Sequence, residues 1–323
     1  MPKRRASAWC RRAPQPSAVG SSTRIATPAP YLVQHQASPC RGELGTGGHV
    51  PPGSFSPRSS LHRAMTLARL STTDGLAHLV LDRPDKRNAL SRELIEALRE
   101  RLAQARTADV RALLVTAEGS TFCAGGDVAW MEQRKDDPSA TREAMEEHLG
   151  PLIEEVDAFP APTVAAVRGA AIGAGLGLAV SCDVTIAAQE AVLGATHARL
   201  GLTPDAGTSW HLTRALGPKR ALDLILGAKT FPGEQADDWG LVSDAVPAGD
   251  VEEVARRRAR QLAEGPTRAL RTARQLVRDA TDVSLVEMLR REAAAQEAMY
   301  ETEDQTEGVE AFLEDREPEF VGR

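Results

Sequence analysis

Long apolar runs are absent from this 323-residue sequence, although 42% of its residues are hydrophobic. No stretch approaches the roughly twenty apolar residues needed to cross a bilayer, because Gly or Arg interrupts the longest candidates. The hydrophobic content is still ample for a buried core. The sequence therefore excludes a membrane-spanning protein and predicts a soluble globular one.

Cysteine is scarce as well. The four cysteines, Cys10, Cys40, Cys123 and Cys182, form neither a CxxC pair nor the Cys/His spacing that is typical of metal ligands. We therefore expect reduced thiols, a cytoplasmic protein and no bound metal.

Acidic residues are nearly missing from the first 64 residues. These residues hold nine Lys or Arg and one Glu, so the rest of the chain carries a net charge of −14 against −6 for the whole. Because Lys and Arg dominate binding to phosphate backbones, an acidic region is a poor partner for nucleic acid. We expect no nucleic-acid partner and no membrane partner.

The first 64 residues are also rich in Arg, Ser, Pro and Gly and have no hydrophobic periodicity, which predicts disorder. An Arg- and Ser-rich, acid-poor leader resembles an organelle transit peptide, but its prolines disfavour the amphipathic helix of such a peptide. Met65 begins a strand-like segment, so a misassigned start codon is the interpretation that we favour.

Strand and helix patterns alternate after this extension. Apolar alternation or continuous apolar runs predict strands at 76–82, 110–116 and 164–167, and a helix capped by Ser91 lies between the first two. This order predicts a parallel sheet with helical crossovers. Beyond residue 207 we expect a short strand at 241–246 and helices at 207–216, 218–226, 250–264, 267–279, 284–301 and 305–315.

Two strand-to-glycine junctions hold the main chemical signal. In segment 162–183 a β-branched run breaks into glycines and resumes as an apolar helix, which leaves backbone N–H groups unpaired at the break. Segment 116–128 repeats this pattern at Ala124, Gly125 and Gly126. The glycines either permit close helix–strand packing or aim one N–H from each junction at a shared carbonyl oxygen, which would stabilise an enolate.

Together with RPDKRNALS at 83–91 and LGLTPDAGTSWHLTRALG at 200–217, these junctions make residues 66–323 resemble the enoyl-CoA hydratase/isomerase family, or crotonase superfamily. The likeness is greatest to its phenylacetate-type enoyl-CoA isomerases. It implies an α/β fold in which ββα units form a spiral core at 65–265, followed by a helical trimerisation region at 266–323. We accordingly expect a homotrimer or a hexamer.

The resemblance also implies where an acyl-CoA thioester binds. The N–H groups of Ala124 and Ala174 would hold the thioester oxygen, and Lys86 and Arg87 would meet the phosphates of coenzyme A. Asn88 and Ala89 would border the coenzyme A path. By the same resemblance, Gly125, Gly126 and Asp127 belong with Ala124 to a family loop that would lie along the pantetheine and adenine. Coenzyme A enters as part of the substrate, so no separate cofactor is expected.

The acid–base residues depart from the hydratase pattern. Hydratases use two glutamates, and the matching positions here are Gly177 and His197. In relatives that move double bonds, an aspartate at the position of Asp205 shuttles the proton, and in 4-chlorobenzoyl-CoA dehalogenases a similarly placed aspartate attacks the ring. The plainer alternative is that Asp205 caps the helix starting near Gly207.

We therefore predict an enoyl-CoA isomerase in which Asp205 moves a proton on an oxyanion-stabilised enolate. His197 is expected to line the substrate or to be packed, and its substitution should affect substrate preference more than the chemical step. Two alternatives stay open. One is an enoyl-CoA hydratase that uses His197 or an arrangement foreign to the family, and the other is a catalytically silent member that binds RNA or a protein partner.

Overall fold

The computed structural model describes residues 66–323. Our predictions for the basic extension at 1–64 and for a start at Met65 lie outside the described residues. The described residues form one compact unit. Among the helices of 66–323, none is both long and apolar enough to cross a bilayer.

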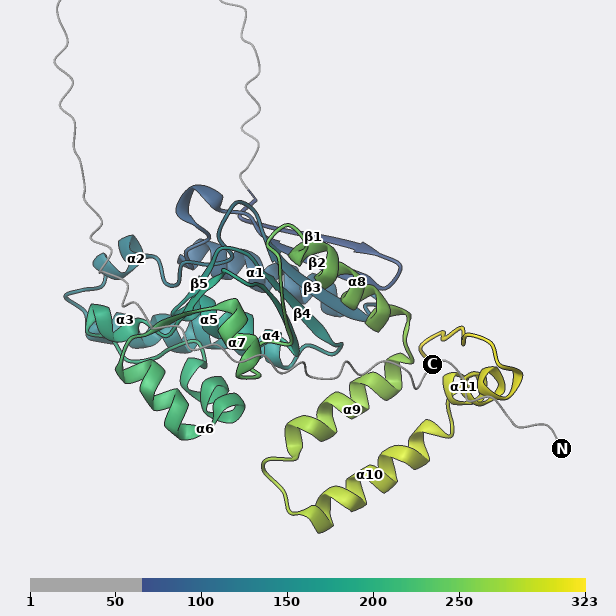
Figure 1. Cartoon of the computed structure of the whole chain (residues 1–323). Helices are drawn as coiled ribbons and strands as arrows, with labels where there is room; N and C mark the ends of the chain where they lie inside the picture. The colour runs from purple at the N-terminus through teal and green to yellow at the C-terminus, as the bar shows by residue number, and fades with distance from the viewer. Residues whose placement is uncertain (1–65) are drawn as a thin grey trace, which may run out of the picture. The chain divides into compact units, whose positions relative to one another are not determined.

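A six-stranded sheet forms the centre of this unit, in the order β1-β2-β3-β4-β6-β9 (Figure 1). The first two strands form a hairpin whose turn, Asp74–Gly75, has φ angles of 50° and 74°, as tight hairpin turns require. All other strand pairings in this six-stranded sheet are parallel, as predicted. The strand bounds are β1 Ala68–Thr73, β2 Leu76–Leu81, β3 Ala112–Ala117, β4 Thr163–Val167, β6 Val184–Ala188 and β9 Asp244–Val246.

Helices cover both faces of this sheet, so alternate side chains of one strand enter two separate cores. Leu113 and Val115 of β3 pack toward the face covered by α1 (Arg92–Thr107). Leu114 packs with the alanines of α8 (Val251–Glu264) on the opposite face. Burial on both faces explains why β3 reads as a continuous apolar run.

A second, three-stranded sheet has the order β5-β7-β8, with bounds Ala170–Ile172, Val192–Gly194 and Thr230–Pro232. Strands β4 and β5 lead directly into α5 (Ala174–Val180), which gives the ββα unit that the resemblance implies. The intervening helices are α2 Val128–Glu132, α3 Pro138–Ala144, α4 Gly150–Asp157 and α7 Gly233–Asp238, with a π-helical segment at Met145–Leu149 and 3₁₀ turns at Pro84–Lys86 and His197–Leu200.

Helix α6 spans Thr208–Leu226 but is broken at Gly217, where φ is 74°. Pro218 follows, so one helical segment ends and the next begins where the sequence predicted two helices. The C-terminal helices are α9 Thr267–Asp279, α10 Leu285–Met299 and α11 Glu303–Glu314.

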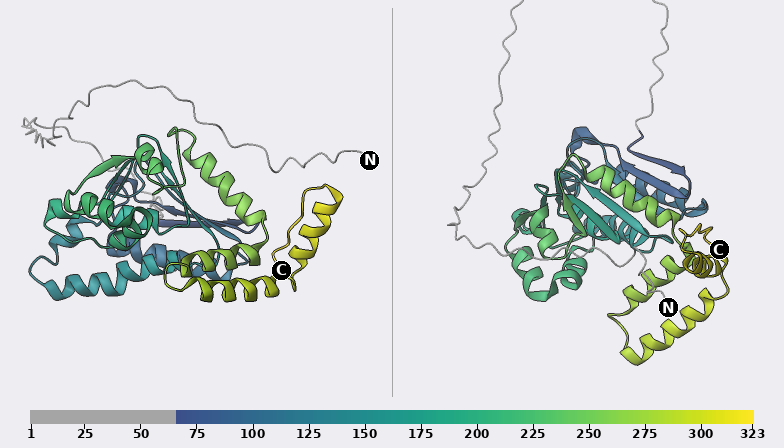
Figure 2. Two further views of the ribbon diagram at one scale, coloured as in Figure 1. Left: turned by 60° about the horizontal axis from the view of Figure 1, so that its bottom comes forward. Right: turned by 45° about the vertical axis from the view of Figure 1, so that its right-hand side comes forward.

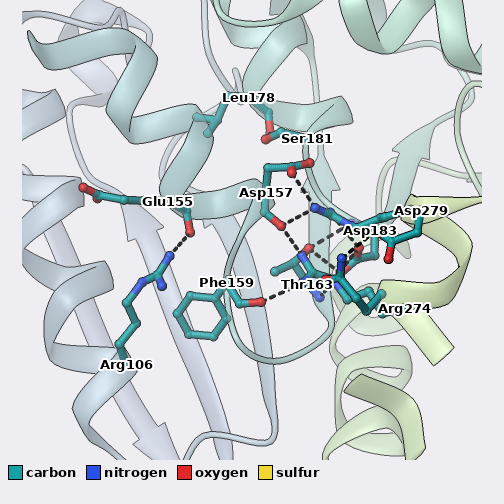
Figure 3. Close-up of polar contacts among 12 residues, drawn as sticks. Arg106, Glu155, Asp157, Phe159, Thr163, Leu178, Ser181, Asp183, Arg274 and Asp279 are labelled. Atoms are coloured by element: carbon teal, nitrogen blue, oxygen red, sulfur yellow. Dashed lines mark hydrogen bonds and ion pairs between the residues drawn. The ribbon is translucent and has the colours of Figure 1, made fainter. Parts of the chain in front are cut away.

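These last three helices extend beside the sheet in all views (Figure 2). Arginines of α9 fasten it to the core (Figure 3). Arg274 Nε donates to both carboxylate oxygens of Asp183 at 2.7 Å, and its Nη1 donates to the Phe159 carbonyl at 2.7 Å. Asp183 in turn accepts from the hydroxyl and N–H of Thr163 at the start of β4. Arg274 thus contacts both the Asp183 carboxylate and the Phe159 carbonyl, and these two contacts hold α9 against the core.

Candidate active site

The two glycine junctions lie side by side. The N–H of Cys123 donates to the Ala170 carbonyl at 3.0 Å, and the N–H of Ile172 donates to the Cys123 carbonyl at 3.1 Å. A Cβ placed on Gly125 would be 3.9 Å from the Ala174 nitrogen. Segments about fifty residues apart therefore meet at one point, as a shared carbonyl site would require.

The two N–H groups expected at this point differ in their bonding. Within residues 66–323 the Ala174 N–H donates no hydrogen bond. The Ala124 N–H, in contrast, donates to the carbonyl oxygen of Arg87 at 3.0 Å. From the sequence we expect both groups to be unpaired, and for Ala124 the structure shows a bond that the sequence did not reveal.

The glycines of α5 also serve close packing, the plainer of the two interpretations. A Cβ at Gly175 would lie 2.4 Å from the Cys123 carbonyl oxygen, and one at Gly177 would lie 2.2 Å from the Ala206 carbonyl oxygen. Both contacts are with backbone, which cannot move aside like a flexible side chain. Packing and exposure of backbone N–H groups thus occur in the same helix turn.

Asp205 lies in the turn before α6, where Ala206 and Gly207 have φ angles of 49° and 66°. Gly207 is the N-cap residue of α6, and no side chain caps this helix. The alternative that Asp205 acts as the helix cap is therefore wrong for its side chain, although its carbonyl accepts from Thr208 N–H at 2.9 Å.

The Asp205 side chain, 21% exposed, belongs to the wall of a cavity of about 540 Å³. Much of that wall is apolar, with Leu149 and Ile153 from the π-helical segment and α4, and Trp210 from α6. His211 lies in the same wall, and burial lowers its pKa, so this imidazole stays neutral at neutral pH. A carboxylate at the edge of an apolar cavity suits proton transfer to or from a bound acyl chain.

His197 occupies the 3₁₀ turn and is buried, with a side chain 6% exposed. Its Nε2 lies 2.9 Å from Oδ1 of Asp205. Its Nδ1 is buried and forms no hydrogen bond within residues 66–323. His197 and Asp205, which the family resemblance indicates as two separate residues of the site, are therefore in direct contact.

The loop that carries Lys86 and Arg87 leaves both cationic side chains exposed. Asn88 is fully buried and bonds to three backbone groups. Its Nδ2 donates to the carbonyls of Glu118 and Thr121 at 2.9 and 2.8 Å, and its Oδ1 accepts from the Arg83 N–H at 2.8 Å. Asn88 thus ties this loop to the segment before Ala124.

Asp127 and Arg83 complete this framework. Arg83 Nη1 lies 2.5 Å from Oδ2 of Asp127 and also donates to the Ala89 carbonyl at 2.9 Å. Oδ1 of Asp127 accepts from the first N–H groups of α2. Burial alone would raise the pKa of Asp127, but these hydrogen bonds outweigh it and lower the pKa. Arg83 was not expected from the sequence, where its one signal is its place immediately before Pro84 in the same motif.

Gly126 borders α2, because a Cβ on Gly126 would meet the Met131 side chain. Cys123, behind the junction, is fully buried, and burial raises its pKa to about 12. Its thiol is therefore protonated and unsuited to nucleophilic attack. Within 66–323, no three His, Cys, Asp or Glu side chains are grouped as metal ligands.

The sequence profile described as "Enoyl-CoA hydratase/isomerase" matches residues 71–323. The chain belongs to the enoyl-CoA hydratase/isomerase family. A Rhodobacter capsulatus protein named "Probable enoyl-CoA hydratase" is 38% identical over 255 residues, covering 79% of this chain and 98% of that protein. The 1,2-epoxyphenylacetyl-CoA isomerase of Escherichia coli is 35% identical over 254 residues, covering 77% of this chain and 96% of that protein.

Solved structures agree with this assignment. The crystal structure of an enoyl-CoA hydratase from Polaromonas sp. matches with a TM-score of 0.75 and 32% identity, covering 78% of this chain and 99% of that one. The crotonase-like α/β fold and the family resemblance are thereby confirmed. Hydratases and isomerases both occur among the relatives, so the reaction must be argued from the site itself.

Proposed function

We propose that this enzyme shifts a double bond along an enoyl-CoA, with Asp205 as the group that carries the proton. The observation that supports this most is the position of the Asp205 carboxylate at an apolar cavity. The two positions at which hydratases hold glutamates have Gly177 and His197 instead. Glu154 and Asp157 also line this cavity, but Asp205 is the cavity carboxylate that lies in a motif of the family resemblance.

The thioester carbonyl would accept hydrogen bonds from the Ala174 and Ala124 N–H groups. For the second of these, the substrate oxygen would replace the Arg87 carbonyl, which is the present acceptor. Such donors stabilise the enolate oxygen, and loss of one donor in other enzymes costs about 3 kcal/mol. Both donors are main-chain groups, so their side chains need only be small.

With a 3-enoyl-CoA, Asp205 would break a C–H bond at C2 and take the proton, while the electron pair enters the dienolate and its oxygen. The same carboxyl group would then return the proton to C4, which forms the conjugated 2-enoyl-CoA. Proton and electrons balance without a redox partner. Coenzyme A takes part only as the carrier of the acyl group.

Other surfaces support the remaining parts of the proposal. The exposed Lys86 and Arg87 offer cations to the phosphates of coenzyme A. Ala89 lies on the same loop, and Gly125, Gly126 and Asp127 lie on the segment hydrogen-bonded to it. A location in the cytoplasm fits the free, buried thiols of Cys123 and Cys182. The acidic charge beyond residue 64 disfavours a nucleic-acid partner.

The C-terminal helices favour assembly into a homotrimer or a hexamer. Large apolar side chains on α10 and α11 are exposed in the single chain, among them Leu285 (73%), Phe312 (77%) and Leu313 (76%). Patches of this kind mark interaction surfaces.

A hydratase is the second candidate. It is favoured by the relatives that carry this name and by the imidazole of His197 in the site. Against it stands the burial of His197, whose Nδ1 has no contact with solvent.

The deciding experiment incubates the protein with a 3-enoyl-CoA in deuterated water and, separately, with a 2-enoyl-CoA. We expect conjugated 2-enoyl-CoA from the first substrate, and much slower formation of 3-hydroxyacyl-CoA from the second. Rapid hydration of the second substrate without isomerisation of the first would reject the proposal. Turnover of neither substrate, with acyl-CoA binding retained, would indicate the silent family member.

A further inference from the structure

The buried imidazole of His197 has one polar partner and one ring nitrogen with none. Nε2 lies 2.9 Å from Asp205 Oδ1, and Nδ1 has no hydrogen-bond partner within residues 66–323. A buried polar atom without a partner is uncommon and costs free energy. The pair must therefore be arranged so that this cost is small, and this condition restricts the protonation state of the imidazole.

Three proton arrangements are possible for this histidine. A proton on Nδ1 alone would bury an unpaired donor and would require a protonated Asp205 to donate to Nε2. A doubly protonated ring would bury an unpaired donor together with a positive charge. A proton on Nε2 alone leaves only a lone pair on Nδ1 and gives a hydrogen bond to an ionised carboxylate, which is the stronger kind. The geometry favours this third arrangement.

The surroundings of the ring hold it in place. The His197 carbonyl accepts from the Leu202 N–H at 3.1 Å, which closes the 3₁₀ turn. On the other side, a Cβ on Gly173 would lie 3.4 Å from Nε2, so the backbone at the start of α5 passes close to the ring. The first contact fixes the backbone of His197, and the second shows that the backbone at Gly173 limits the space on one side of its ring.

Asp205 has no comparable support of its own. It precedes two residues with positive φ, and its Oδ1 is the oxygen bonded to His197, while its Oδ2 forms no hydrogen bond within the described residues. Without His197 the carboxylate would be free to rotate about its side-chain bonds at the edge of the cavity. A misplacement of about 1 Å can cost a reaction about 10²-fold in rate.

We propose that His197 is a positioning residue, which holds Oδ1 of Asp205 through its Nε2–H and leaves Oδ2 as the oxygen that carries the proton. This proposal rests on the isomerase function proposed above. It gives His197 a role in the chemical step, where the sequence had indicated a role in substrate preference.

Three variants test it in the full chain. His197→Leu removes the donor, and His197→Gln keeps a side-chain N–H near the position of Nε2. With a 3-enoyl-CoA, we expect His197→Leu to lower kcat by about 10- to 100-fold with KM within about twofold. His197→Gln should keep kcat within about threefold of the wild type. The matched control is His78→Gln, at a half-buried histidine bonded to Thr116 on the central sheet, and its kcat should be unchanged.

A double variant separates this proposal from the isomerase function itself. If His197 acts through Asp205, His197→Leu should lower kcat no further when Asp205 is already Asn. Loss of activity in Asp205→Asn together with full activity in His197→Leu would reject the positioning role alone. Full activity in Asp205→Asn would reject the proposed function. Equal losses in the Leu and Gln variants, with a raised KM, would assign His197 to substrate contact instead.

The wild-type protein offers a test that does not depend on the folding of any variant. Nitrogen-15 labelling of histidine distinguishes a protonated ring nitrogen from an unprotonated one by NMR. We expect the His197 resonances to show a proton on Nε2 and none on Nδ1 at neutral pH. A proton on Nδ1, alone or in a doubly protonated ring, would overturn the assignment.

Discussion

Gly177 of α5 lies directly against Ala206, and a Cβ at residue 177 would be 2.2 Å from the Ala206 carbonyl oxygen. Ala206 follows Asp205, so the turn that presents Asp205 occupies the space into which a side chain at 177 would project. By the family resemblance, residue 177 is where hydratases hold a glutamate. In this chain, a side chain at residue 177 and the turn that carries Asp205 therefore compete for the same space.

This packing predicts that a glutamate cannot simply be restored. Gly177→Glu should lower the free energy of unfolding by about 1–3 kcal/mol or more, because the clash is with backbone. We expect no gain in hydration of a 2-enoyl-CoA. Gly249→Glu is the control: a Cβ there meets nothing within 4 Å, and stability should change by less than about 0.5 kcal/mol. Urea unfolding measures both, and a stable Gly177→Glu hydratase would contradict the argument.

Asp205→Asn should separate binding from catalysis. The amide keeps the size of the side chain but cannot take a proton, so isomerase kcat should fall by about 10²-fold or more while acyl-CoA still binds. Calorimetry with a non-reacting acyl-CoA and turnover assays measure the two quantities. The control is Asp223→Asn, which replaces an exposed carboxylate of α6 that pairs with Lys229. It should leave both acyl-CoA binding and kcat unchanged. Loss of binding and turnover together would indicate a structural role for Asp205.

Asn88 should matter for the framework rather than for direct substrate contact. Asn88→Ala leaves two carbonyls and one N–H without side-chain partners, and it places alanine at a φ of 53°. We expect a loss of about 2–4 kcal/mol in the free energy of unfolding. Asn88→Gly suits the backbone and should be less harmful by about 1 kcal/mol. Unfolding curves that are the same for the wild type and both variants would refute this role.

His78 predicts a pH dependence of stability. Burial, with help from the Arg256 guanidinium, lowers its pKa from 6.5 to about 4. The unfolded chain takes up a proton as pH falls through 6.5, whereas the folded chain does not until about 4. This contribution is therefore complete above pH 6.5 and is lost progressively as pH falls toward 4.

The comparison variant is His78→Gln, which does not titrate and keeps a polar group facing Thr116. Between pH 7 and pH 4.5 the wild type should lose about 1–2 kcal/mol more stability than the variant, a figure reduced for the partial exposure of the ring. Parallel stability curves for the two proteins would show that His78 titrates normally.

Assembly is tested at the exposed apolar faces of α10 and α11. Light scattering at micromolar concentration should give three or six times the monomer mass for the wild type. Leu285→Asp combined with Phe312→Asp should shift the protein toward monomer, because a buried unpaired charge is costly at an interface. Leu226→Asp, at a side chain 75% exposed on α6, is the matched control and should keep the assembly. A monomer mass for the wild type would reject the proposed homotrimer or hexamer.

The sequence predicted those parts of the fold that local patterns determine. The strands β2, β3 and β4 follow from their apolar runs, and the break in α6 follows from Gly217 and Pro218. Strands β5, β6, β7 and β8 were missed. Of these, β5, β7 and β8 have three residues each, too few for a period, and their pairing joins distant segments.

In the candidate site, too, local motifs could be predicted and contacts between distant segments could not. Its motifs pointed to Asp205 and to the two junctions, since these lie within single segments. The contacts between these segments could not be predicted from the sequence. The bond from Ala124 to Arg87, the contact of His197 with Asp205 and the burial of Asn88 all depend on how separate loops pack. The expectation that the residues around Asn88 and Ala89 border the coenzyme A path stays a prediction, and the burial of the Asn88 side chain adds a role that the sequence did not reveal.

The bond between the Ala124 N–H and the Arg87 carbonyl has a consequence for selectivity. A small carboxylic acid or free thioester would have to break this bond with nothing to replace the contacts of the surrounding loop. A ligand that carries coenzyme A would touch that same loop, so its binding energy would compensate for displacing Arg87. In the proposed mechanism, recognition of the carrier and activation of the acyl carbonyl would then be a single event, and the resting protein would bind small carboxylic acids weakly.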